Sequence, residues 1–257
     1  MTVTTRKIAT AKAKRGGAYR EDLAYIHDDG FGFFAADAAP WLLTLFGGGK
    51  LRDGLVIDLG CGSGIWARAL DHAGYQVLGY DISPAMVALA AARVPRGQFR
   101  ALPLLKAPLK PCVAVTAIGE VFNYLFDKHN SLAELAKLFE RVYTALRPGG
   151  LFVFDVATPG RVPGGLRQSY REGPDWACLF EAREDPLAKT VTRYITTFRK
   201  DGSLYRRDRE VHRLQLYERA PLMAHLRDCG FRVRTVSNYG KTTFPPGYLG
   251  FVAQKPA

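Results

Sequence analysis

The stretch of sequence that decides the fold class is Val56-Ile57-Asp58-Leu59-Gly60-Cys61-Gly62-Ser63-Gly64. Its apolar start predicts a short buried strand, and residues 65–73 after the glycines have the pattern of a helix. Glycines let the main chain turn sharply and let a ligand approach it closely. The loop therefore predicts either a simple tight connection or, because it lies between a strand and a helix, a nucleoside-binding turn of an α/β protein.

The spacing of the glycines narrows the class of ligand. The loop reads G-x-G-x-G, whereas the dinucleotide pattern G-x-G-x-x-G would need glycine where Ile65 stands. The phosphate-loop pattern G-K-[ST] does not occur in the sequence. Asp81 ends the second predicted strand, where a carboxylate can accept hydrogen bonds from both ribose hydroxyls. These residues therefore predict the binding of a nucleoside that carries no phosphate chain.

Strands and helices alternate outward from this loop. The predicted strands are residues 55–59, 76–80, 98–102, 113–118, 151–155, 231–237 and 250–254. The predicted helices are residues 65–73, 84–93, 131–146 and 221–229, and the N-caps Ser83 and Ser131 begin two of them. This alternation predicts a doubly wound, mostly parallel seven-stranded sheet with helices on both faces.

Two further segments accompany this pattern. Residues 19–49 are expected to form a helical stretch with a strong apolar face. Residues from about 159 to 218 are expected to form an antiparallel β insertion. In it, Lys200-Asp201-Gly202 joins two strand patterns rich in Thr, Tyr and Arg, residues 190–198 and 203–217. We expect both segments to act as lids over the carboxyl edge of the sheet.

The charge of the chain is uneven. The formal net charge is +12, which raises the question of a polyanionic partner. Half of the excess lies before the first acid, Glu21, and comes from Arg6, Lys7, Lys12, Lys14, Arg15 and Arg20. Residues 1–18 are therefore expected to be a disordered, solvated tail, with a polyanion-binding arm and a transit-peptide-like segment as alternatives. Residues 19–257 are expected to form a single domain.

The sequence also carries information on location and assembly. It contains no uninterrupted apolar window of about 18 residues, and its N-terminus lacks the apolar core of a secretory signal. The four cysteines, Cys61, Cys112, Cys178 and Cys229, are far apart and form no C-x-x-C pair. We therefore expect a cytoplasmic protein without a membrane partner or a metal site, which is either a monomer or a homodimer.

Three motifs carry a family resemblance. Asp58-Leu59-Gly60-Cys61-Gly62-Ser63-Gly64 resembles the first motif of class I methyltransferases that depend on S-adenosylmethionine (SAM). Tyr80-Asp81-Ile82-Ser83 is similar to their second motif, and Arg147-Pro148-Gly149-Gly150-Leu151 resembles the turn before their fifth strand. The resemblance covers about residues 55 to 155. It implies the Rossmann-like methyltransferase fold, SAM as cofactor, and methyl transfer as the activity.

The resemblance also implies which residues hold the cofactor. Gly60, Gly62 and their neighbours would line the methionine part, Asp58 would order the loop and favour the cationic end, and Asp81 would hold the ribose. The full implied set is Asp58, Gly60, Cys61, Gly62, Ser63, Gly64, Trp66, Asp81, Ile82, Leu102, Ile118 and Gly119. The sequence departs from the family where an acid often contacts the adenine amino group, because Arg100-Ala101-Leu102-Pro103 stands there.

Candidate residues for the methyl acceptor come from three regions. Glu120, Asn123 and Tyr124 follow the fourth predicted strand, at the edge where ligands bind in this fold class. His27 is a candidate base, and Tyr25 next to it a candidate contact, if the N-terminal segment covers the site. In the insertion, Arg193 and Arg207 stand among aromatic residues and are suited to an anionic or aromatic acceptor. Each could equally be a solvated or structural residue.

The leading functional hypothesis is a methyltransferase that acts on an oxygen or nitrogen nucleophile of a small molecule. One alternative is an RNA or protein methyltransferase, which the net charge of +12 motivates. Another is a SAM-binding regulatory protein without catalysis. Two missing acids motivate it: the one that contacts adenine, and one common near the start of the fourth strand, where Cys112-Val113-Ala114 stands. Methyl transfer depends largely on orienting the acceptor, so a catalytic base is required only where the acceptor must lose a proton.

Overall fold

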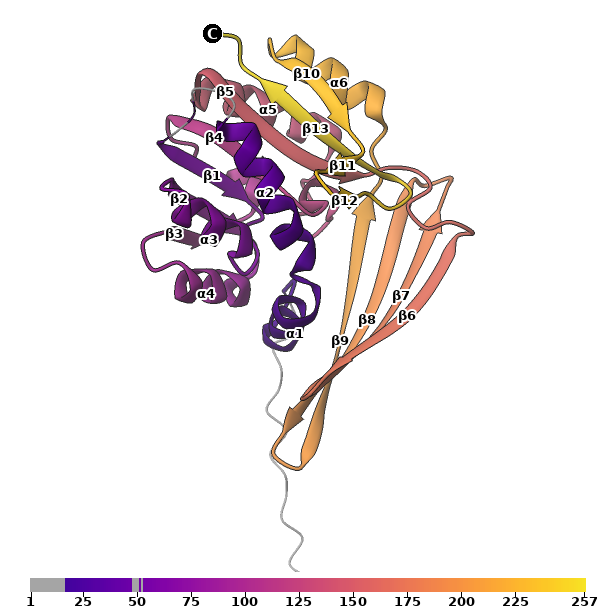
Figure 1. The fold of residues 1–257 in the computed structure, drawn as a ribbon. Helices are drawn as coiled ribbons and strands as arrows, with labels where there is room; N and C mark the ends of the chain where they lie inside the picture. Colours follow the sequence, from indigo (N-terminus) through magenta and orange to yellow (C-terminus); the bar gives the residue numbers. More distant parts are fainter. Residues whose placement is uncertain (1–16, 48–50, 52) are drawn as a thin grey trace, which may run out of the picture.

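The computed structural model describes residues 17–47, 51 and 53–257. Residues 1–16 of the predicted tail and residues 48–49 of the predicted helical stretch lie outside the described residues. Within the described part, the chain forms a seven-stranded core sheet with helices, a separate four-stranded antiparallel sheet, and a small two-stranded one (Figure 1).

The core sheet confirms the predicted doubly wound fold. Its strands are β1 (Leu55–Leu59), β2 (Gln76–Asp81), β3 (Gln98–Ala101), β4 (Cys112–Ala117), β5 (Leu146–Ala157), β10 (Arg232–Val236) and β13 (Tyr248–Gln254). They lie in the order β10-β13-β5-β4-β1-β2-β3, with β13 antiparallel to both of its neighbours and the five strands from β5 to β3 parallel. The carboxyl ends of β1, β2, β4 and β5 therefore meet at one edge of the sheet.

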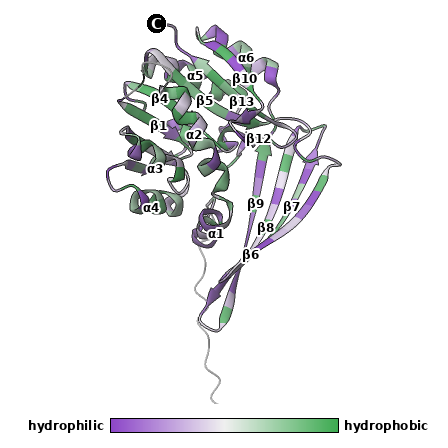
Figure 2. Ribbon diagram, viewed as in Figure 1, coloured by the Kyte–Doolittle hydropathy of each residue, from purple (hydrophilic) through white to green (hydrophobic). Residues whose placement is uncertain are grey.

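Helices cover both faces of this sheet. One apolar cluster packs β strands against α5 (Leu132–Ala145) and α6 (Arg219–Asp228). The other packs the opposite face against α2 (Phe33–Gly47) and α3 (Ile65–His72), with α4 (Pro84–Arg93) beside them. The central strands β4 and β5 are largely apolar, as Figure 2 shows, because both of their faces are buried.

The N-terminal stretch consists of two helices, α1 (Glu21–Phe31) and α2, which differ in direction by 58°. The break falls at Gly32, where a Cβ atom would collide with the side chain of Ile65 and the carbonyl oxygen of Asp28. In the part of the chain that the structure describes, no single helix is long and apolar enough to cross a membrane. The bent pair α1–α2 passes that criterion by length and composition only.

The predicted insertion forms a four-stranded antiparallel sheet, hereafter the insertion sheet. Its strands are β6 (Leu166–Gly173), β7 (Trp176–Asp185), β8 (Thr190–Asp201) and β9 (Leu204–Gln215), in that order. The hairpin β8–β9 was expected from the Asp-Gly turn, whereas β6 and β7 were not predicted as separate strands. Buried and exposed residues alternate along β7, β8 and β9, so one face of the sheet turns toward the core.

Three details differ from the predicted elements. The strand β5 begins at Leu146, five residues earlier than expected, and its pairing with β4 shifts register between Cys112 and Ala114. Short 3₁₀ turns, η1 (Leu104–Lys106) and η2 (Val121–Asn123), follow β3 and β4. A two-residue hairpin, β11 (Asn238–Tyr239) and β12 (Thr242–Thr243), precedes β13.

Candidate active site

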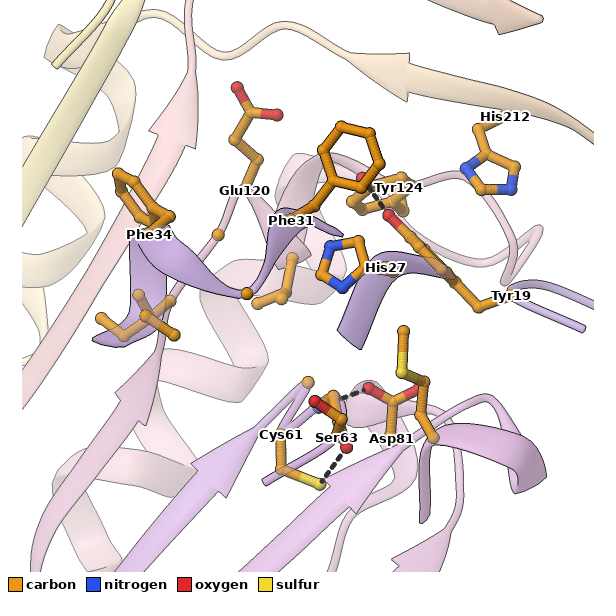
Figure 3. A pocket seen from close by; sticks show the side chains of 18 of the residues that line it. Tyr19, His27, Phe31, Phe34, Cys61, Ser63, Asp81, Glu120, Tyr124 and His212 are labelled. Carbon is orange, nitrogen blue, oxygen red and sulfur yellow. Dashed lines mark hydrogen bonds between the residues drawn. The ribbon is translucent and has the colours of Figure 1, made fainter. Parts of the chain in front are cut away.

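A cavity of about 680 Å³ lies at the carboxyl edge of the core sheet. Its core side consists of the glycine loop, the end of β2, and residues 103–105 after β3. Its insertion side includes Tyr19 and residues from three regions: α1, the segment after β4, and the insertion sheet. Figure 3 shows Cys61, Ser63 and Asp81 facing Glu120, His27 and Tyr19 across this space.

The glycine loop is held against the end of β2. Gly60 and Gly62 have φ values of 72° and 51°, which other residues adopt rarely. The carboxylate of Asp81 accepts hydrogen bonds from the main-chain N–H groups of Gly62 at 2.9 Å and Ser83 at 2.8 Å. A Cβ atom at Gly62 would contact no described atom within 4 Å. The main chain at Gly62 is therefore open to a ligand, as the sequence predicts for this loop.

Asp58, at the end of β1, is a buried carboxyl group with few protein partners. Its Oδ1 accepts a hydrogen bond from the hydroxyl of Thr116 at 2.7 Å, and Trp66 Nε1 donates to the same hydroxyl at 3.1 Å. Burial raises the pKa of Asp58 to about 7, the Asp81 carboxylate contributes in the same direction, and the Thr116 bond opposes it. A cation next to this carboxyl group would favour its ionised form.

The core side of the cavity fits SAM in chemistry. Carboxyl groups at Asp58 and Asp81 suit an ammonium, a sulfonium and ribose hydroxyls, since an ionised carboxylate offers about four acceptor positions. Apolar side chains stand where an adenine ring would pack: Ile82, Met86, Pro103, Leu104 and Leu105 line the cavity. Free N–H groups at the start of α3, beyond the loop, suit the carboxylate of an amino acid.

Asp155, near the carboxyl end of β5, holds the segment after β4 that lines the cavity. It is fully buried and accepts hydrogen bonds from the N–H groups of Gly119 and Glu120 and from the hydroxyls of Tyr239 and Tyr248, at 2.6–3.1 Å. Burial raises the pKa of Asp155 to about 6, although the bonds from Tyr248, Tyr239 and the Glu120 N–H act against that rise. The bonds hold Gly119 and Glu120 in left-handed conformations, with φ values of 98° and 60°.

Glu120 lies in a buried cluster of charges rather than free in the cavity. Its Oε1 accepts from Arg161 Nε and its Oε2 from Arg193 Nη2, the latter at 2.5 Å. Arg193 also donates to the Tyr124 hydroxyl at 3.0 Å, and that hydroxyl is 2.8 Å from the hydroxyl of Tyr19. Burial alone would raise the pKa of Glu120, but Arg193 and Arg161 outweigh it and hold the pKa below its usual value. A carboxylate paired in this way is a poor proton acceptor.

Two histidines line the insertion side. Burial lowers the pKa of His27 to about 4, so its imidazole is neutral at pH 7. His212 is 1% exposed, and its Nε2 lies 2.9 Å from Glu210 Oε2. Glu210 also accepts from the main-chain N–H groups of Tyr19 and Arg20. The pair therefore fastens the beginning of the N-terminal segment to β9.

The N-terminal segment is attached to both sides of the cavity. On the core side, Ser83 Oγ donates to the Tyr19 carbonyl at 2.7 Å, and Arg93 forms an ion pair with Asp28. On the insertion side, the ion pairs Arg20–Asp208 and Arg206–Asp22 and the hydrogen bond from Trp176 Nε1 to Asp29 join it to the sheet. Helix α1 thus closes the cavity where the core and the insertion sheet meet (Figure 1).

Three residues predicted to contact the acceptor do not line the cavity. Asn123 is fully buried, and its side-chain amide bonds the main chain of Ala157 and Gln215, which joins the core to the insertion sheet. Tyr25 donates to Asp175 at 3.3 Å and lies under the guanidinium of Arg199. Arg207 is exposed and lies on the outer face of β9. The geometry assigns these residues to packing and solvent instead.

Two residues of the implied cofactor set also lie off the cavity. Gly64 has its Cα against Ala90, so its missing side chain allows α3 and α4 to approach each other. Leu102 donates its N–H to the carbonyl of Asp81, while Pro103 to Leu105 beyond it line the cavity. The remaining ten residues of that set do line it: Asp58, Gly60, Cys61, Gly62, Ser63, Trp66, Asp81, Ile82, Ile118 and Gly119.

Sequence reasoning missed several residues that shape the insertion side. Arg161, Asp155, Tyr19 and His212 were not singled out. Arg161 and Tyr19 lie in segments without periodicity, and their partners Glu120 and Tyr124 are 41 and 105 residues away. The alternation of buried residues along β9 was the one signal that could have pointed to Glu210 and His212.

Comparison with known proteins agrees with this geometry. Residues 56–150 match the family described as Methyltransferase domain. A putative methyltransferase of Geobacillus sp. is 26% identical over 193 residues, which cover 71% of this chain and 75% of the relative. The 18S rRNA (guanine(1575)-N(7))-methyltransferase of Saccharomyces cerevisiae is 30% identical over 105 residues, 38% of each chain.

Solved structures share the fold over nearly the whole chain. A SAM-dependent methyltransferase from Clostridium acetobutylicum superposes with a TM-score of 0.77 at 17% identity, covering 91% of this chain and 98% of the other. The sugar N-methyltransferase KedS8 from Streptoalloteichus sp. superposes with a TM-score of 0.72 at 19% identity, covering 100% and 99%. Residues 56–150 thus match a methyltransferase domain, and the chain shares the class I fold of SAM-dependent methyltransferases; these findings indicate a methyltransferase that uses SAM as its cofactor.

Proposed function

We propose that this methyltransferase acts on an oxygen or nitrogen nucleophile of a small molecule. The observation that carries the proposal is the enclosure of the cavity by separate segments of the chain, among them the glycine loop, α1, the segment after β4, the insertion sheet and residues 242–248. A volume of about 680 Å³ has to hold both cofactor and acceptor, which favours a compact acceptor. A sugar N-methyltransferase among the structural neighbours supports the same class of acceptor.

The residues of the chain serve mainly to bind and orient. SAM supplies an electrophilic methyl group on a sulfonium when it is bound. Asp81 is proposed to bind the ribose hydroxyls, Asp58 to face the cationic part, and residues 60–63 to lie against the amino acid portion. Ile118 and Gly119 border the path to the acceptor. Holding an acceptor in line with that methyl group supplies much of the rate in such a displacement.

No strong general base is part of the proposal. Glu120 is occupied by two arginines, and the pKa of His27 is about 4. We therefore assign Glu120 to positioning Arg161 and Arg193, and Tyr124 to the wall beside them. His27 presents a neutral imidazole whose Nδ1 has no hydrogen-bond partner among the described residues, so it is suited to accepting a hydrogen bond from the acceptor.

A second candidate function is the methylation of RNA. The outer face of β9 exposes Arg207, Arg209 and Arg213 at alternate positions, and rRNA methyltransferases are among the relatives. Such a stripe suits a phosphate backbone. The insertion-side wall of the cavity, which encloses the position next to the cofactor, favours the small molecule.

The two functions are separated by a methyl-transfer assay on fractionated cell extract. Protein and SAM labelled on the methyl carbon are incubated with either the low-molecular-weight fraction or total RNA. Label that enters the small-molecule fraction supports the proposal, and label that enters RNA alone refutes it. Binding of RNA is measured across salt concentrations in parallel, because phosphate contacts give a steep salt dependence. The proposal includes a cytoplasmic location, which the four unpaired cysteines support.

A further inference from the structure

A row of residues crosses the inner face of the insertion sheet. The strand registers place Arg167 opposite Ala182, Ala182 opposite Arg193, and Arg193 opposite His212. Arg167, Arg193 and His212 line the cavity, and Ala182 between the two arginines is buried in an apolar cluster. Arg161, from the loop before β6, reaches the same region and lies over the ring of Tyr248.

These arginines have more N–H donors than the protein uses. Arg161 donates through Nε to Glu120, and its two terminal nitrogens bond no group in the described ranges. The Nε of Arg193 is buried without a partner among the residues that the structure describes. Arg167 forms neither a hydrogen bond nor an ion pair with any described residue. Guanidinium groups with unused N–H donors that line a cavity are suited to an oxyanion.

The charges on this side of the cavity do not balance. Arg161 and Arg193 share one carboxylate, that of Glu120, and the exposed Arg167 adds a third positive charge to the lining. The other acid that lines this side, Asp127, accepts hydrogen bonds from the main chain and ring of His129. The side chains of Arg161 and Arg193 are 16% and 12% exposed, so water screens their charge only in part. A protonated amine would be repelled here, and an anion attracted.

Aromatic side chains stand beside these arginines. The cavity is also lined by Phe31, Phe34, Phe180 and Tyr248. They offer an apolar surface next to the free N–H groups, which suits a flat organic body that carries an anionic group.

We propose that the acceptor is an organic oxyanion, a carboxylate or a phosphate, whose anionic group binds Arg161, Arg167 and Arg193. The proposal rests on the small-molecule function above and specifies its substrate class. The anionic group lies against the insertion sheet, and the methylated atom faces residues 118–119. Positive charge on the insertion side therefore favours the anionic acceptor, and the carboxyl groups on the core side favour the cationic cofactor.

The test uses simple aromatic probes and the full chain saturated with S-adenosylhomocysteine. Titration calorimetry compares benzoate and phenyl phosphate with the neutral benzamide, and the two anions separate a carboxylate from a phosphate site. We expect at least one anion to bind about tenfold more tightly than benzamide, as charge-assisted hydrogen bonds predict. Arg161→Gln should remove most of this preference and Arg167→Gln part of it, with the affinity for S-adenosylhomocysteine unchanged.

Arg207→Gln is the matched control, because Arg207 lies on the outer face of the same sheet. Equal affinity for anions and benzamide would overturn the proposal, as would failure of both anions to bind, or an equal loss in Arg207→Gln. Transfer of label to a neutral small molecule, unaffected by Arg161→Gln, would overturn only the oxyanion inference. Transfer to RNA alone would overturn the small-molecule function itself.

Discussion

The two sides of the cavity are built in different ways. The core side comes from one continuous part of the chain, residues 58–105, and its polar contacts are mostly main-chain N–H groups and two carboxyl groups. The insertion side comes from Tyr19 and α1, the segment after β4, Arg161 and the insertion sheet, and its contacts join side chains far apart in the sequence. The first arrangement suits a constant cofactor, and the second allows the acceptor to differ between relatives that share the fold.

The largest expected effect concerns Glu120, on the insertion side. Glu120→Gln removes the carboxylate that Arg161 and Arg193 share, and leaves two partly buried guanidinium groups without their counter-charge. Breaking a buried ion pair from one side typically costs about 3–5 kcal/mol. We expect a loss of that size in the free energy of unfolding, measured by urea titration.

Glu181→Gln provides the control for this variant. Glu181 bonds Gln168 and Arg183 on the outer face of the insertion sheet, where solvent screens the pair. Its loss should cost less than about 1 kcal/mol. If both variants lose the same small amount, the Glu120 cluster does not hold the insertion side together.

The next effect concerns Asp81, on the core side. Asp81→Ala should weaken SAM binding by about 1–3 kcal/mol, because charge-assisted hydrogen bonds to the ribose and to Gly62 are lost. Titration calorimetry measures the affinity, and thermal unfolding without ligand shows how much of the change comes from the loop. Asp71→Ala, which removes an ion pair with Arg96 on the surface, should leave the affinity as it is. An unchanged affinity in Asp81→Ala would rule out the ribose assignment.

A smaller effect is expected from pH. The pKa of Asp58 is about 7 without ligand, and a cationic ligand favours the ionised carboxylate, so binding releases a proton. Affinity for SAM should therefore rise as the pH increases from about 6 to about 8, by at most tenfold for each unit by which the pKa falls. Calorimetry in several buffers measures both affinity and proton release. Asp58→Asn should flatten the profile, and an equally steep profile in that variant would assign the dependence to another group.

The smallest effect is expected from Tyr25. Tyr25→Phe removes only a long hydrogen bond to Asp175 and keeps the ring beneath Arg199. The cost should stay below about 1 kcal/mol in urea unfolding. Binding of S-adenosylhomocysteine should not change, because Tyr25 does not line the cavity. A marked loss of that binding would show that α1 controls the core side through this contact.

The sequence predicts the core side well because its determinants are local. The glycine loop, the end of β2 and the N-cap Ser83 each depend on neighbours a few residues away, and the structure has these elements where they were predicted. The doubly wound sheet follows from the same alternation of strands and helices. Leu102 was predicted to contact the cofactor, whereas the residues that line the cavity begin one position later, at Pro103. An error of one residue is typical of positions at the end of a strand.

The insertion side could be predicted only in outline. The Asp-Gly turn identifies the hairpin β8–β9, but β6 is mostly exposed and polar, so its pattern gives little signal. The break of the N-terminal stretch at Gly32 depends on contact with Ile65, in a different helix. The role of Asn123 depends likewise on the main chain of Ala157 and Gln215, 34 and 92 residues away. Such long-range pairs leave no mark in a single sequence.

The hydrogen bonds to Asp155 have a consequence for the order in which the protein is completed. Two of its four donors, Tyr239 and Tyr248, lie C-terminal to the glycine loop and to the insertion sheet, so a ribosome makes them later than both. The glycine loop can take its shape while the rest of the chain is still being synthesised, since domains begin to form from their N-terminal parts. The bend at Gly119 and Glu120 acquires these two supports only when residues 239 and 248 dock, so the insertion side of the cavity is completed after the glycine loop.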